Sequence, residues 1–170
     1  MQRIMVIGCC GAGKSTFSQQ LSEINGLEII HLDQYYWQPN WVATESIEWK
    51  NTIAQLSAKS SWIMDGNYGG TMETRIEHAD TIIFLNYSTA KCLWRITKRI
   101  WKYWGTERPD MTKGCKERFD LNFYHYVATY NLKRRKPLLE KLENYKNEKQ
   151  ILIFKNDEEA NEFLSKINME

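Results

Sequence analysis

The chain has 170 residues, of which 42% are hydrophobic and 26% charged, so it is long enough for one domain with its own hydrophobic core. This composition excludes a low-complexity disordered chain and a small scaffold that depends on disulfides. The 23 Lys and Arg residues against 21 Asp and Glu residues give a net charge of only +2. The four cysteines show no C-x-x-C or His-rich spacing, so we predict neither a zinc site nor a disulfide framework.

The sequence carries no sign of targeting to a membrane or to secretion. Its first apolar run ends at Gly8, too early for a signal peptide, and no apolar stretch approaches the length of a membrane span. We therefore expect a reduced, cytoplasmic protein without a membrane partner. Both a monomer and a homodimer are compatible with the sequence.

Five short apolar runs, rich in Ile and Val, recur along the chain. Runs that are apolar at successive positions are typical of parallel strands buried on both faces. Segments with helical spacing lie between them, for example Trp49, Ile53 and Leu56. This alternation predicts an α/β fold with helices on both faces of a parallel sheet. The predicted strands are Ile4–Ile7, Leu27–Leu32, Trp62–Met64, Thr81–Leu85 and Ile151–Phe154.

The stretch 89–146 departs from this alternation, because it contains helical patterns and a loop over 105–111 but no apolar strand. It is also basic, since 13 Lys and Arg residues but only four acidic residues lie between Lys91 and Lys136. Such a segment suits an anionic ligand, but a solvated basic surface is the competing interpretation. We predict one domain over 1–170, with a basic helical lid inserted at 89–146.

A glycine-rich motif follows the first apolar run and matches G-x-x-x-x-G-K-[ST] in full. Its glycines let successive backbone N–H groups point at one phosphate group, and the next helix turns its positive end to the same anion. Lys14 would then reach the β- and γ-phosphates, and the Ser15 hydroxyl would hold Mg²⁺. We therefore predict ATP and Mg²⁺ as cofactors. The predicted nucleotide-binding residues of this P-loop are Gly8, Cys9, Cys10, Gly11, Ala12, Gly13, Lys14, Ser15 and Thr16.

Two common classes of P-loop protein do not fit this sequence. A Ras-like GTPase would carry N-K-x-D after a late strand, whereas residues 154–157 read Phe-Lys-Asn-Asp. A motor or AAA-type ATPase would follow its third-strand aspartate with a glutamate, but Asp65 is followed by Gly66. A small kinase remains, in which the acceptor supplies the nucleophile and the protein supplies positioning and charge.

Basic side chains of the predicted lid helix 89–104 fall on one face, away from the apolar stripe that would pack inward. Closure of this face over ATP would bring positive charge to the migrating phosphoryl group, and arginine suits such contacts because it binds phosphate in a bidentate manner. A purely structural helix explains the apolar stripe equally well. The cations of this face are Arg95, Lys98, Arg99 and Lys102, and the predicted catalytic arginines are Arg95, Arg99 and Arg135.

Two aspartates follow predicted strands and so lie at the edge where parallel sheets bind ligands. Asp33 could accept the proton of an acceptor hydroxyl, or orient Mg²⁺ through water. Asp65 has the same placement and is predicted to help Ser15 hold Mg²⁺. The alternative for both aspartates is a helix N-cap or an Asx turn.

Longer segments of the chain carry a family resemblance. They are His31-Leu32-Asp33, Tyr36-Trp37-x-Pro39-x-Trp41, Trp62 to Tyr68, Ala79 to Leu85 and Glu117-Arg118-Phe119-Asp120. Together with the P-loop they resemble the adenylate kinase group, and look most like the adenylate-kinase-related proteins labelled DNA topology modulation (FlaR-like) proteins. The resemblance spans nearly the whole chain. It implies a three-layer P-loop NTPase fold of the nucleoside or nucleotide kinase type, with the five predicted strands in the parallel order 2-3-1-4-5.

The acceptor would bind beside Asp33 and at the turn after the third strand. Aromatic side chains near Asp33 could stack on a planar base or a sugar face, although an aromatic mini-core under a loop explains them as well. Adenylate kinase holds its acceptor phosphate with an arginine in the turn after D-G-F, and here Arg75 is the nearest substitute. The predicted acceptor-binding residues are Asp33, Tyr36, Trp37, Asn67, Tyr68 and Arg75.

The sequence thus favours an ATP-dependent phosphotransferase that acts on a small acceptor such as a nucleoside or nucleotide. In this fold we expect the loop at Asn156 to contact the base. The alternative is a nucleotide-binding regulatory protein that affects DNA topology by binding DNA, a reading suggested by the family label and the basic segment. Nucleic acid is the less favoured partner, because the chain as a whole is only weakly basic and ATP already accounts for the basic segment. An ATPase without an acceptor is a third alternative.

Overall fold

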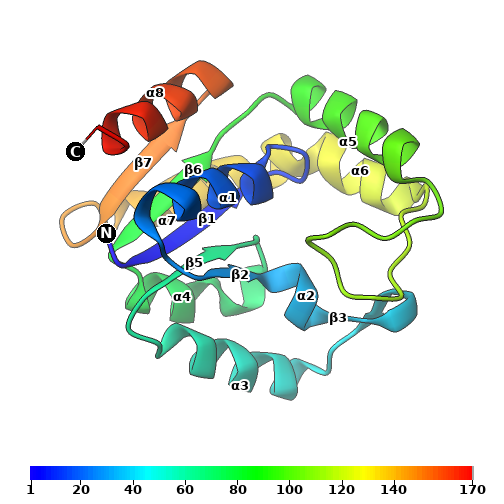
Figure 1. Cartoon of the computed structure of the whole chain (residues 1–170), viewed down its shortest axis with the longest axis horizontal. Coiled ribbons are helices and arrows are strands. Elements are labelled where there is room, and N and C mark those ends of the chain that lie inside the picture. Colours follow the sequence, from blue (N-terminus) through cyan, green and yellow to red (C-terminus); the bar gives the residue numbers. More distant parts are fainter. Residues whose placement is uncertain (170) are drawn as a thin grey trace.

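A parallel sheet forms the centre of the computed structural model, which describes residues 1–169 (Figure 1). Its strand order is β2-β5-β1-β6-β7, and every neighbouring pair is parallel. This is the order 2-3-1-4-5 of the main strands, so the predicted α/β class and the sheet order are confirmed. The strands are β1 Arg3–Gly8, β2 Ile29–His31, β5 Trp62–Asp65, β6 Thr81–Leu85 and β7 Gln150–Phe154.

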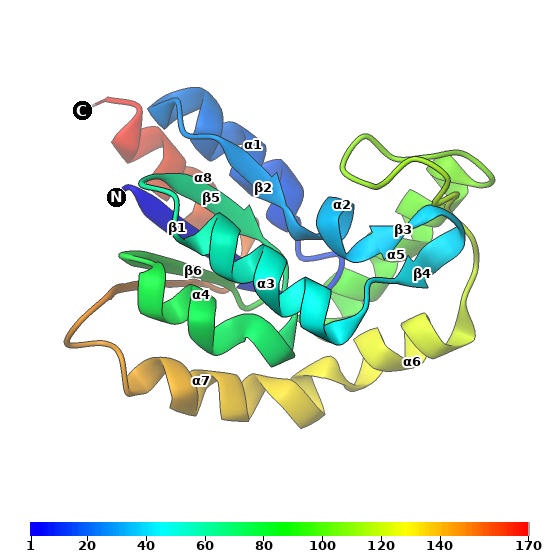
Figure 2. The ribbon, with the colours of Figure 1, turned by 90° about the horizontal axis from the view of Figure 1, so that it is seen from below.

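Both faces of the three central strands, β1, β5 and β6, are buried, because these strands are apolar at successive positions. Ile4 and Val6 of β1 pack on one face with side chains from α1 and α8. Met5 and Ile7 pack on the other face with side chains from α3, α4 and α7. Figure 2 shows the two groups of helices on opposite sides of the sheet, which gives the three layers. These helices are α1 Lys14–Asn25, α3 Ser46–Ser57, α4 Met72–His78, α7 Lys136–Glu143 and α8 Asp157–Ile167.

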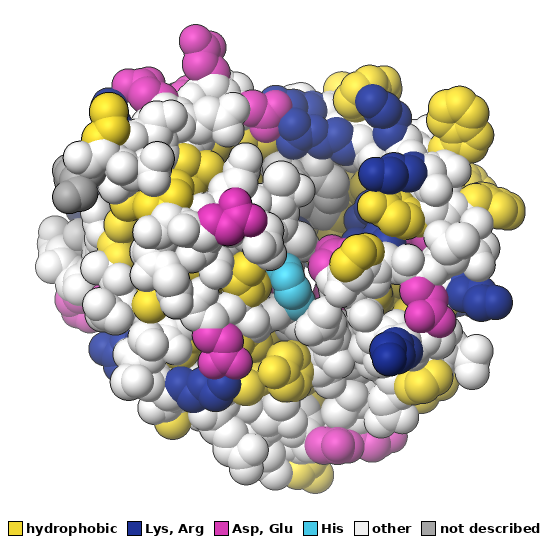
Figure 3. Space-filling model, in the orientation of Figure 1, with side chains coloured by type: hydrophobic (Ala, Val, Ile, Leu, Met, Phe, Trp, Pro, Cys, Tyr) yellow, Lys and Arg dark blue, Asp and Glu magenta, His cyan; other side chains and the backbone are white. Residues whose placement is uncertain are grey.

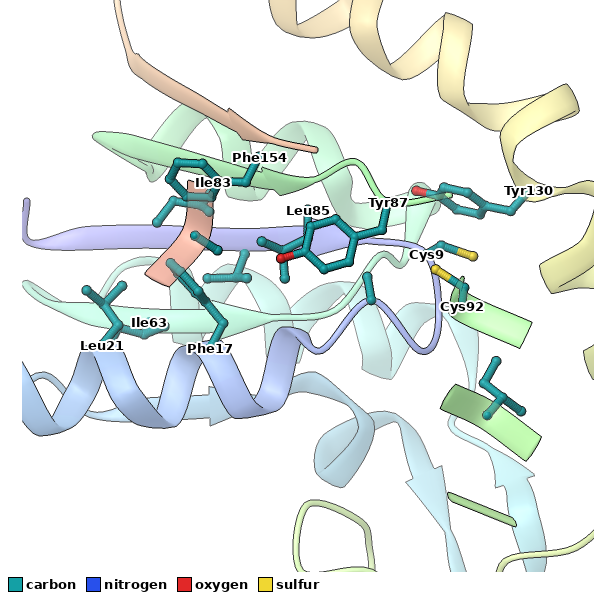
Figure 4. Close-up of a cluster of buried hydrophobic side chains, with 14 of the residues drawn as sticks. Cys9, Phe17, Leu21, Ile63, Ile83, Leu85, Tyr87, Cys92, Tyr130 and Phe154 are labelled. Carbon is teal, nitrogen blue, oxygen red and sulfur yellow. The ribbon is translucent and has the colours of Figure 1, made fainter. Parts of the chain in front are cut away.

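The first apolar cluster reaches from the sheet into the glycine-rich loop (Figure 4). Phe17 of α1 packs against Phe154 of β7, with ring centroids 6.0 Å apart. At the other end of the cluster, the buried thiols of Cys9 and Cys92 point toward each other. The start of the glycine-rich loop is therefore fixed by core packing on both sides.

The predicted helical segment lies between β6 and β7. It contains α5 Thr89–Tyr103, α6 Leu121–Tyr130 and a π-helical turn Asn131–Arg135 that leads into α7. Helices α5 and α6 lie side by side at one end of the molecule (Figure 1). In contrast, α7 covers the sheet, because its residues Leu138 and Leu142 belong to the second apolar cluster. Within residues 1–169, no helix is both long and apolar enough to cross a membrane.

Short elements that the sequence pattern did not indicate follow β2. The strand ends at His31 and the chain turns at once into α2 Leu32–Tyr36, then into a hairpin of β3 Trp37–Gln38 and β4 Val42–Ala43. Asp33 consequently lies in the first turn of α2 rather than in an extended loop.

Residues 105–118, here called the strap, connect α5 to the segment before α6 and cross to the hairpin. The indole Nε1 of Trp41 donates to the carbonyl of Lys116 at 2.9 Å, and the backbone N–H of Asn40 donates to the carbonyl of Gly114 at 3.1 Å. The side chain of Gln34 donates to the carbonyl of Pro109 at 3.1 Å. These bonds tie the strap to α2 and the hairpin, on the far side of the cleft described next.

Candidate active site

A cleft with a volume of about 1390 Å³ opens where the glycine-rich loop, α2, α5, α6 and the strap meet. A pocket for one small ligand usually measures about 300–1,000 Å³, so this cleft has room for two. Figure 3 shows Lys and Arg side chains gathered around the hollow. The predicted site residues that line it are Cys10, Gly11, Ala12, Gly13, Lys14, Ser15, Thr16, Asp33, Trp37, Asp65, Asn67, Tyr68, Arg95 and Arg99.

The glycine-rich loop has the backbone of an anion-binding turn. Gly13 has a φ of +93° and precedes α1, and in the described chain no side chain caps this helix. The first N–H groups of α1 therefore remain available to an anion. Gly11 has a φ of +83° and lies so close to α5 that a Cβ there would be 2.4 Å from the Cys92 carbonyl oxygen. Only glycine fits at this contact, which holds the loop against the lid helix.

Gly8 and Cys9 begin the motif but do not line the cleft. The side chain of Asn67 bonds both backbone groups of Gly8, accepting from its N–H at 3.0 Å and donating to its carbonyl at 2.7 Å. Cys9 is buried, and its hydrogen bond with Cys92 together with burial raises the pKa of its thiol. Gly8 and Cys9 thus support the loop from its buried side. Asn67 joins the loop to the end of β5 through its two bonds to Gly8.

Lys14 and Ser15 face the cleft from the start of α1. The Lys14 Nζ donates to the carbonyl of Gly8 at 3.1 Å and lies 3.4 Å from the carbonyl of Cys9, so its side chain folds back along its own loop. A bound phosphate could take the place of these two carbonyls, because the lysine ammonium has three N–H donors that can bond a phosphate instead.

Asp65 lies at the carboxyl end of β5 and is buried at the floor of the cleft. Its Oδ1 bonds the His31 Nδ1 at 3.1 Å, whereas its Oδ2 is buried without a hydrogen-bond partner among the described residues. Burial acts to lower the pKa of His31, but the hydrogen bond and charge of Asp65 outweigh it and raise that pKa. An unsatisfied carboxylate oxygen near a serine hydroxyl fits a Mg²⁺ ion with its water ligands.

Asp33 faces the cleft from α2, and the Tyr68 hydroxyl donates to its Oδ1. Burial raises the pKa of the Asp33 carboxyl, while the hydrogen bond from Tyr68 and the charge of Lys14 offset part of that rise. A half-buried carboxylate with a raised pKa is suited to accept a proton. The Asp33 side chain therefore has the environment of a general base.

An aromatic cluster supports this carboxylate. The rings of Tyr36, Trp49 and Tyr68 pack on one another with centroids 4.6–5.1 Å apart. Tyr36 lies within this cluster and does not line the cleft, whereas Trp37 and Trp41 do, in an edge-to-face pair 5.5 Å apart. Tyr36, which the sequence predicted to bind the acceptor, is thus part of the aromatic cluster that supports Asp33. Trp41, rather than Tyr36, lines the cleft together with Trp37.

Arg75 is placed where it cannot meet an acceptor. Its side chain is fully buried, and its guanidinium donates to the carbonyls of Gly66 at 2.9 Å, Asn67 at 2.7 Å and Tyr68 at 2.9 Å. Burial lowers its pKa to about 10. The expectation that Arg75 replaces the phosphate-binding arginine of adenylate kinase is therefore wrong, because its donors already hold the turn after β5.

The four cations predicted to share one face of α5 do not share one environment. Arg95 and Arg99 line the cleft, while Lys98 lies outside it, over the Trp94 ring at 4.5 Å from the centroid. Arg95 donates to the carbonyl of Ala12 at 3.2 Å and pairs with Asp157 at 2.6 Å, so it lies directly beside the glycine-rich loop.

Arg99 pairs with a buried acid of the strap. Glu117 Oε1 is 3.2 Å from the Arg99 guanidinium, and Glu117 Oε2 is 2.7 Å from the Nε of Arg108. Arg108 also pairs with Asp110 at 2.9 Å. This alternating chain of charges connects α5 to the strap, which lies against α2 and the hairpin.

Two further predicted residues lie outside the cleft lining. Arg135 is exposed on the π-helical turn, and its neighbours Lys133 and Arg134 line the cleft instead. The Asn156 side chain, whose loop was expected to contact the base, caps α8 by accepting from the N–H of Glu159 at 2.9 Å. The helical register of 131–135 decides which cation faces inward, and a π-helical turn changes that register.

Several cleft residues carried no predicted role. Arg118 belongs to a motif quoted above, and Tyr126 and Tyr130 follow helical spacing, so weak signals existed for these three. Arg134 had none, because its neighbours in sequence are equally basic, and Arg108 lies between Glu107 and Pro109 in a loop that matches no motif. The unpredicted lining residues include Arg108, Arg118, Tyr126, Tyr130, Lys133 and Arg134.

Comparison with known proteins gave matches in structure only. No family model matches this chain. No curated protein matches it either. A deoxyadenosine kinase from M. mycoides has 18% identity and a TM-score of 0.50, over 98% of each chain. A shikimate kinase from Acinetobacter baumannii has 16% identity and a TM-score of 0.57, over 98% of this chain and 90% of the other. A gluconokinase from Sinorhizobium meliloti 1021 has 16% identity and a TM-score of 0.53, over 99% of this chain and 94% of the other. At such identities these matches show that the fold is that of the P-loop small-molecule kinases.

Replacement of Arg75 tests its structural role. We expect Arg75→Met to lower the free energy of unfolding by about 2–4 kcal/mol, because buried carbonyls lose a charged donor. Lys59→Met, which removes an exposed pair with Glu28, is the control and should cost under about 1 kcal/mol. Urea unfolding measures both variants. An Arg75→Met protein that unfolds at the wild-type midpoint would contradict this assignment.

Proposed function

We propose that this chain is an ATP-dependent kinase that transfers the γ-phosphate to a hydroxyl group of a small acceptor such as a nucleoside or nucleotide. The observation that carries the proposal is the placement of a half-buried carboxylate with a raised pKa, Asp33, in the same cleft as the glycine-rich loop. A phosphate site and a proton acceptor that share one cleft are the parts a phosphoryl transfer to a hydroxyl requires. The kinase folds described above agree with this reaction class.

On the ATP side, the proposed roles follow from the loop geometry. The N–H groups at the start of α1 bind the phosphates, and Lys14 exchanges its bonds to its own loop for bonds to the β- and γ-phosphates. Ser15 and the free oxygen of Asp65 would hold Mg²⁺, which when bound neutralises charge on the phosphates. Arg95 lies beside Ala12 and contributes a further positive charge.

On the acceptor side, Asp33 takes the proton as the acceptor oxygen bonds to the γ-phosphorus. The bond between the γ-phosphorus and the β,γ-bridging oxygen breaks, and ADP leaves with its electron pair. Tyr68 holds the Asp33 carboxylate in place. Within the single proposed domain, α5, the strap and α6 act as the lid that excludes water. Arg118 and Arg134, rather than Arg135, are the arginines that this lid would bring to the phosphates.

The first test removes the P-loop lysine. We expect Lys14→Ala to lower kcat about 10²–10³-fold, since a charged donor aimed at the transferred phosphate is lost. Lys50→Ala, an exposed lysine outside the cleft lining, is the control. Acceptor-dependent ADP release measures turnover, and calorimetry measures ATP binding. Intact ATP binding and turnover in Lys14→Ala would refute the kinase assignment.

The second test uses the pH profile. The Tyr68 hydroxyl lowers the pKa of Asp33, so Tyr68→Phe should raise that pKa further. The base works only when ionised, and activity falls as pH drops through its pKa. We therefore expect the acid limb of kcat/KM to move to higher pH in Tyr68→Phe. The control is Tyr145→Phe, which removes a hydroxyl that bonds Glu73 at the surface. An unmoved acid limb in Tyr68→Phe would exclude Asp33 as the base.

One observation favours a second function, the binding of single-stranded nucleic acid suggested by the FlaR-like resemblance. Trp94 and Trp101 on the outer side of α5 are 61% and 86% exposed, and Lys98 lies over the Trp94 ring. Exposed rings interleaved with cations can stack bases and contact phosphates. Such binding should weaken steeply as salt rises, and Trp101→Ala should weaken it about tenfold. Tryptophan fluorescence titration with oligodeoxynucleotides measures this, and no binding at physiological salt would rule it out.

A further inference from the structure

We propose that the acceptor is an uncharged hydroxyl compound with a flat ring face, the chemistry shared by nucleosides and sugars, and that compounds bearing a phosphate or carboxylate are disfavoured. This inference rests on the proposed kinase function and narrows its substrate class. It follows from the charges around Asp33, from the place of each nearby arginine and from the aromatic wall.

The acceptor end of the cleft holds a cation that is already neutralised. Arg108 contacts Asp110 at 2.9 Å and Glu117 at 2.7 Å, and the side chains of Arg108 and Glu117 are only 9% and 4% exposed. Removing one partner from such a buried pair leaves an uncompensated charge, which is strongly unfavourable. Arg108 therefore does not leave its acids to bind an anionic acceptor.

Two further arginines on this side are also engaged. Arg99 and Arg108 both pair with Glu117. Arg75 is buried beneath the turn after β5, where its guanidinium donates to backbone carbonyls. Arg134 is not paired with an acid in the described chain, but it lies over the ring of Tyr126 at 4.5 Å from the centroid. Tyr126 and Cys10 of the P-loop pack against the same apolar cluster, which puts this cation on the P-loop side of the cleft.

The ion-paired network beside Asp33 does not add positive charge. Asp33, Asp110 and Glu117 carry three negative charges against the two positive charges of Arg99 and Arg108. Asp33 and Asp110 both line the cleft, so these carboxylates face the same space. A phosphate or carboxylate on the acceptor would meet like charge there, next to arginines whose charge is already balanced by acids.

The walls of this space suit a neutral ring. Trp37 and Trp41 line the cleft, and the bond from the Trp41 indole to the Lys116 carbonyl fixes that ring against the strap. A fixed aromatic surface binds a nucleobase or the apolar face of a sugar at little entropic cost. Asp33 then receives the proton of the hydroxyl as the ester bond forms.

The test compares matched pairs of acceptors with the purified full chain and MgATP. One arm holds nucleosides, sugars and polyols, and the other holds nucleoside 5′-monophosphates, sugar phosphates and sugar acids. Acceptor-dependent ADP release gives kcat/KM for each. We expect an uncharged compound to exceed its anionic counterpart at least about tenfold, and the nucleoside and sugar members show which ring is preferred. An anionic compound that exceeds its neutral parent overturns the inference while leaving the kinase function intact. If no compound in either arm stimulates ADP release, the proposed function fails and the inference fails with it.

A variant tests the cause of the preference. Asp110→Asn removes one of the two acids that neutralise Arg108, so the ratio of kcat/KM for a phosphorylated acceptor to that for its parent should rise about tenfold. Glu158→Gln removes the same charge at an exposed position outside the cleft lining, and should leave the ratio unchanged. An unchanged ratio in Asp110→Asn would show that these acids do not set the preference.

Discussion

The candidate site depends on one buried guanidinium beneath the turn after β5. Arg75 holds the carbonyls of Gly66, Asn67 and Tyr68. The Asn67 side chain in turn bonds both backbone groups of Gly8, and the Tyr68 hydroxyl bonds Asp33. One turn therefore fixes the glycine-rich loop and the candidate base at the same time. In-line transfer needs the two to keep a constant separation, and a rigid turn supplies it without any contact to either substrate.

Much of the positive charge of the basic insertion is used in ion pairs within the protein, which its composition alone did not indicate. Arg99 and Arg108 pair with acids of the strap. These acids are Asp110 and Glu117. Among the described residues, Lys133 and Arg134 on the turn before α7 and Arg118 at the end of the strap line the cleft and form no ion pair. The insertion thus contains two groups of cations. The ion-paired arginines shape the cleft near the strap, and the cations without an ion pair are suited to bind polyphosphate.

Local patterns predicted the strands, the glycine-rich loop and most of the cleft lining, because these features depend on neighbours in the chain. The roles expected for Arg75 and Asn156 required both side chains to face the cleft, and a local pattern does not show which way a side chain faces in the folded chain. Arg75 is held by a turn on the preceding strand, and Asn156 simply caps the helix that follows it. Likewise, the strap reaches Trp41 across 75 residues, a contact that only the folded sheet makes possible.

Solvent exposure separates the arginine pairs that can exchange partners from those that cannot. Arg95 and Asp157 are 30% and 44% exposed, so water screens their pair and its net contribution is at most about 1 kcal/mol. A bound phosphate beside Ala12 can replace Asp157 at little cost. The pair of Arg108 and Glu117 is almost fully buried, and breaking it would leave a charge in a low-dielectric interior at a cost of about 3–5 kcal/mol. Arg95 can therefore exchange Asp157 for a phosphate group, whereas Arg108 cannot exchange Glu117 for an anionic group.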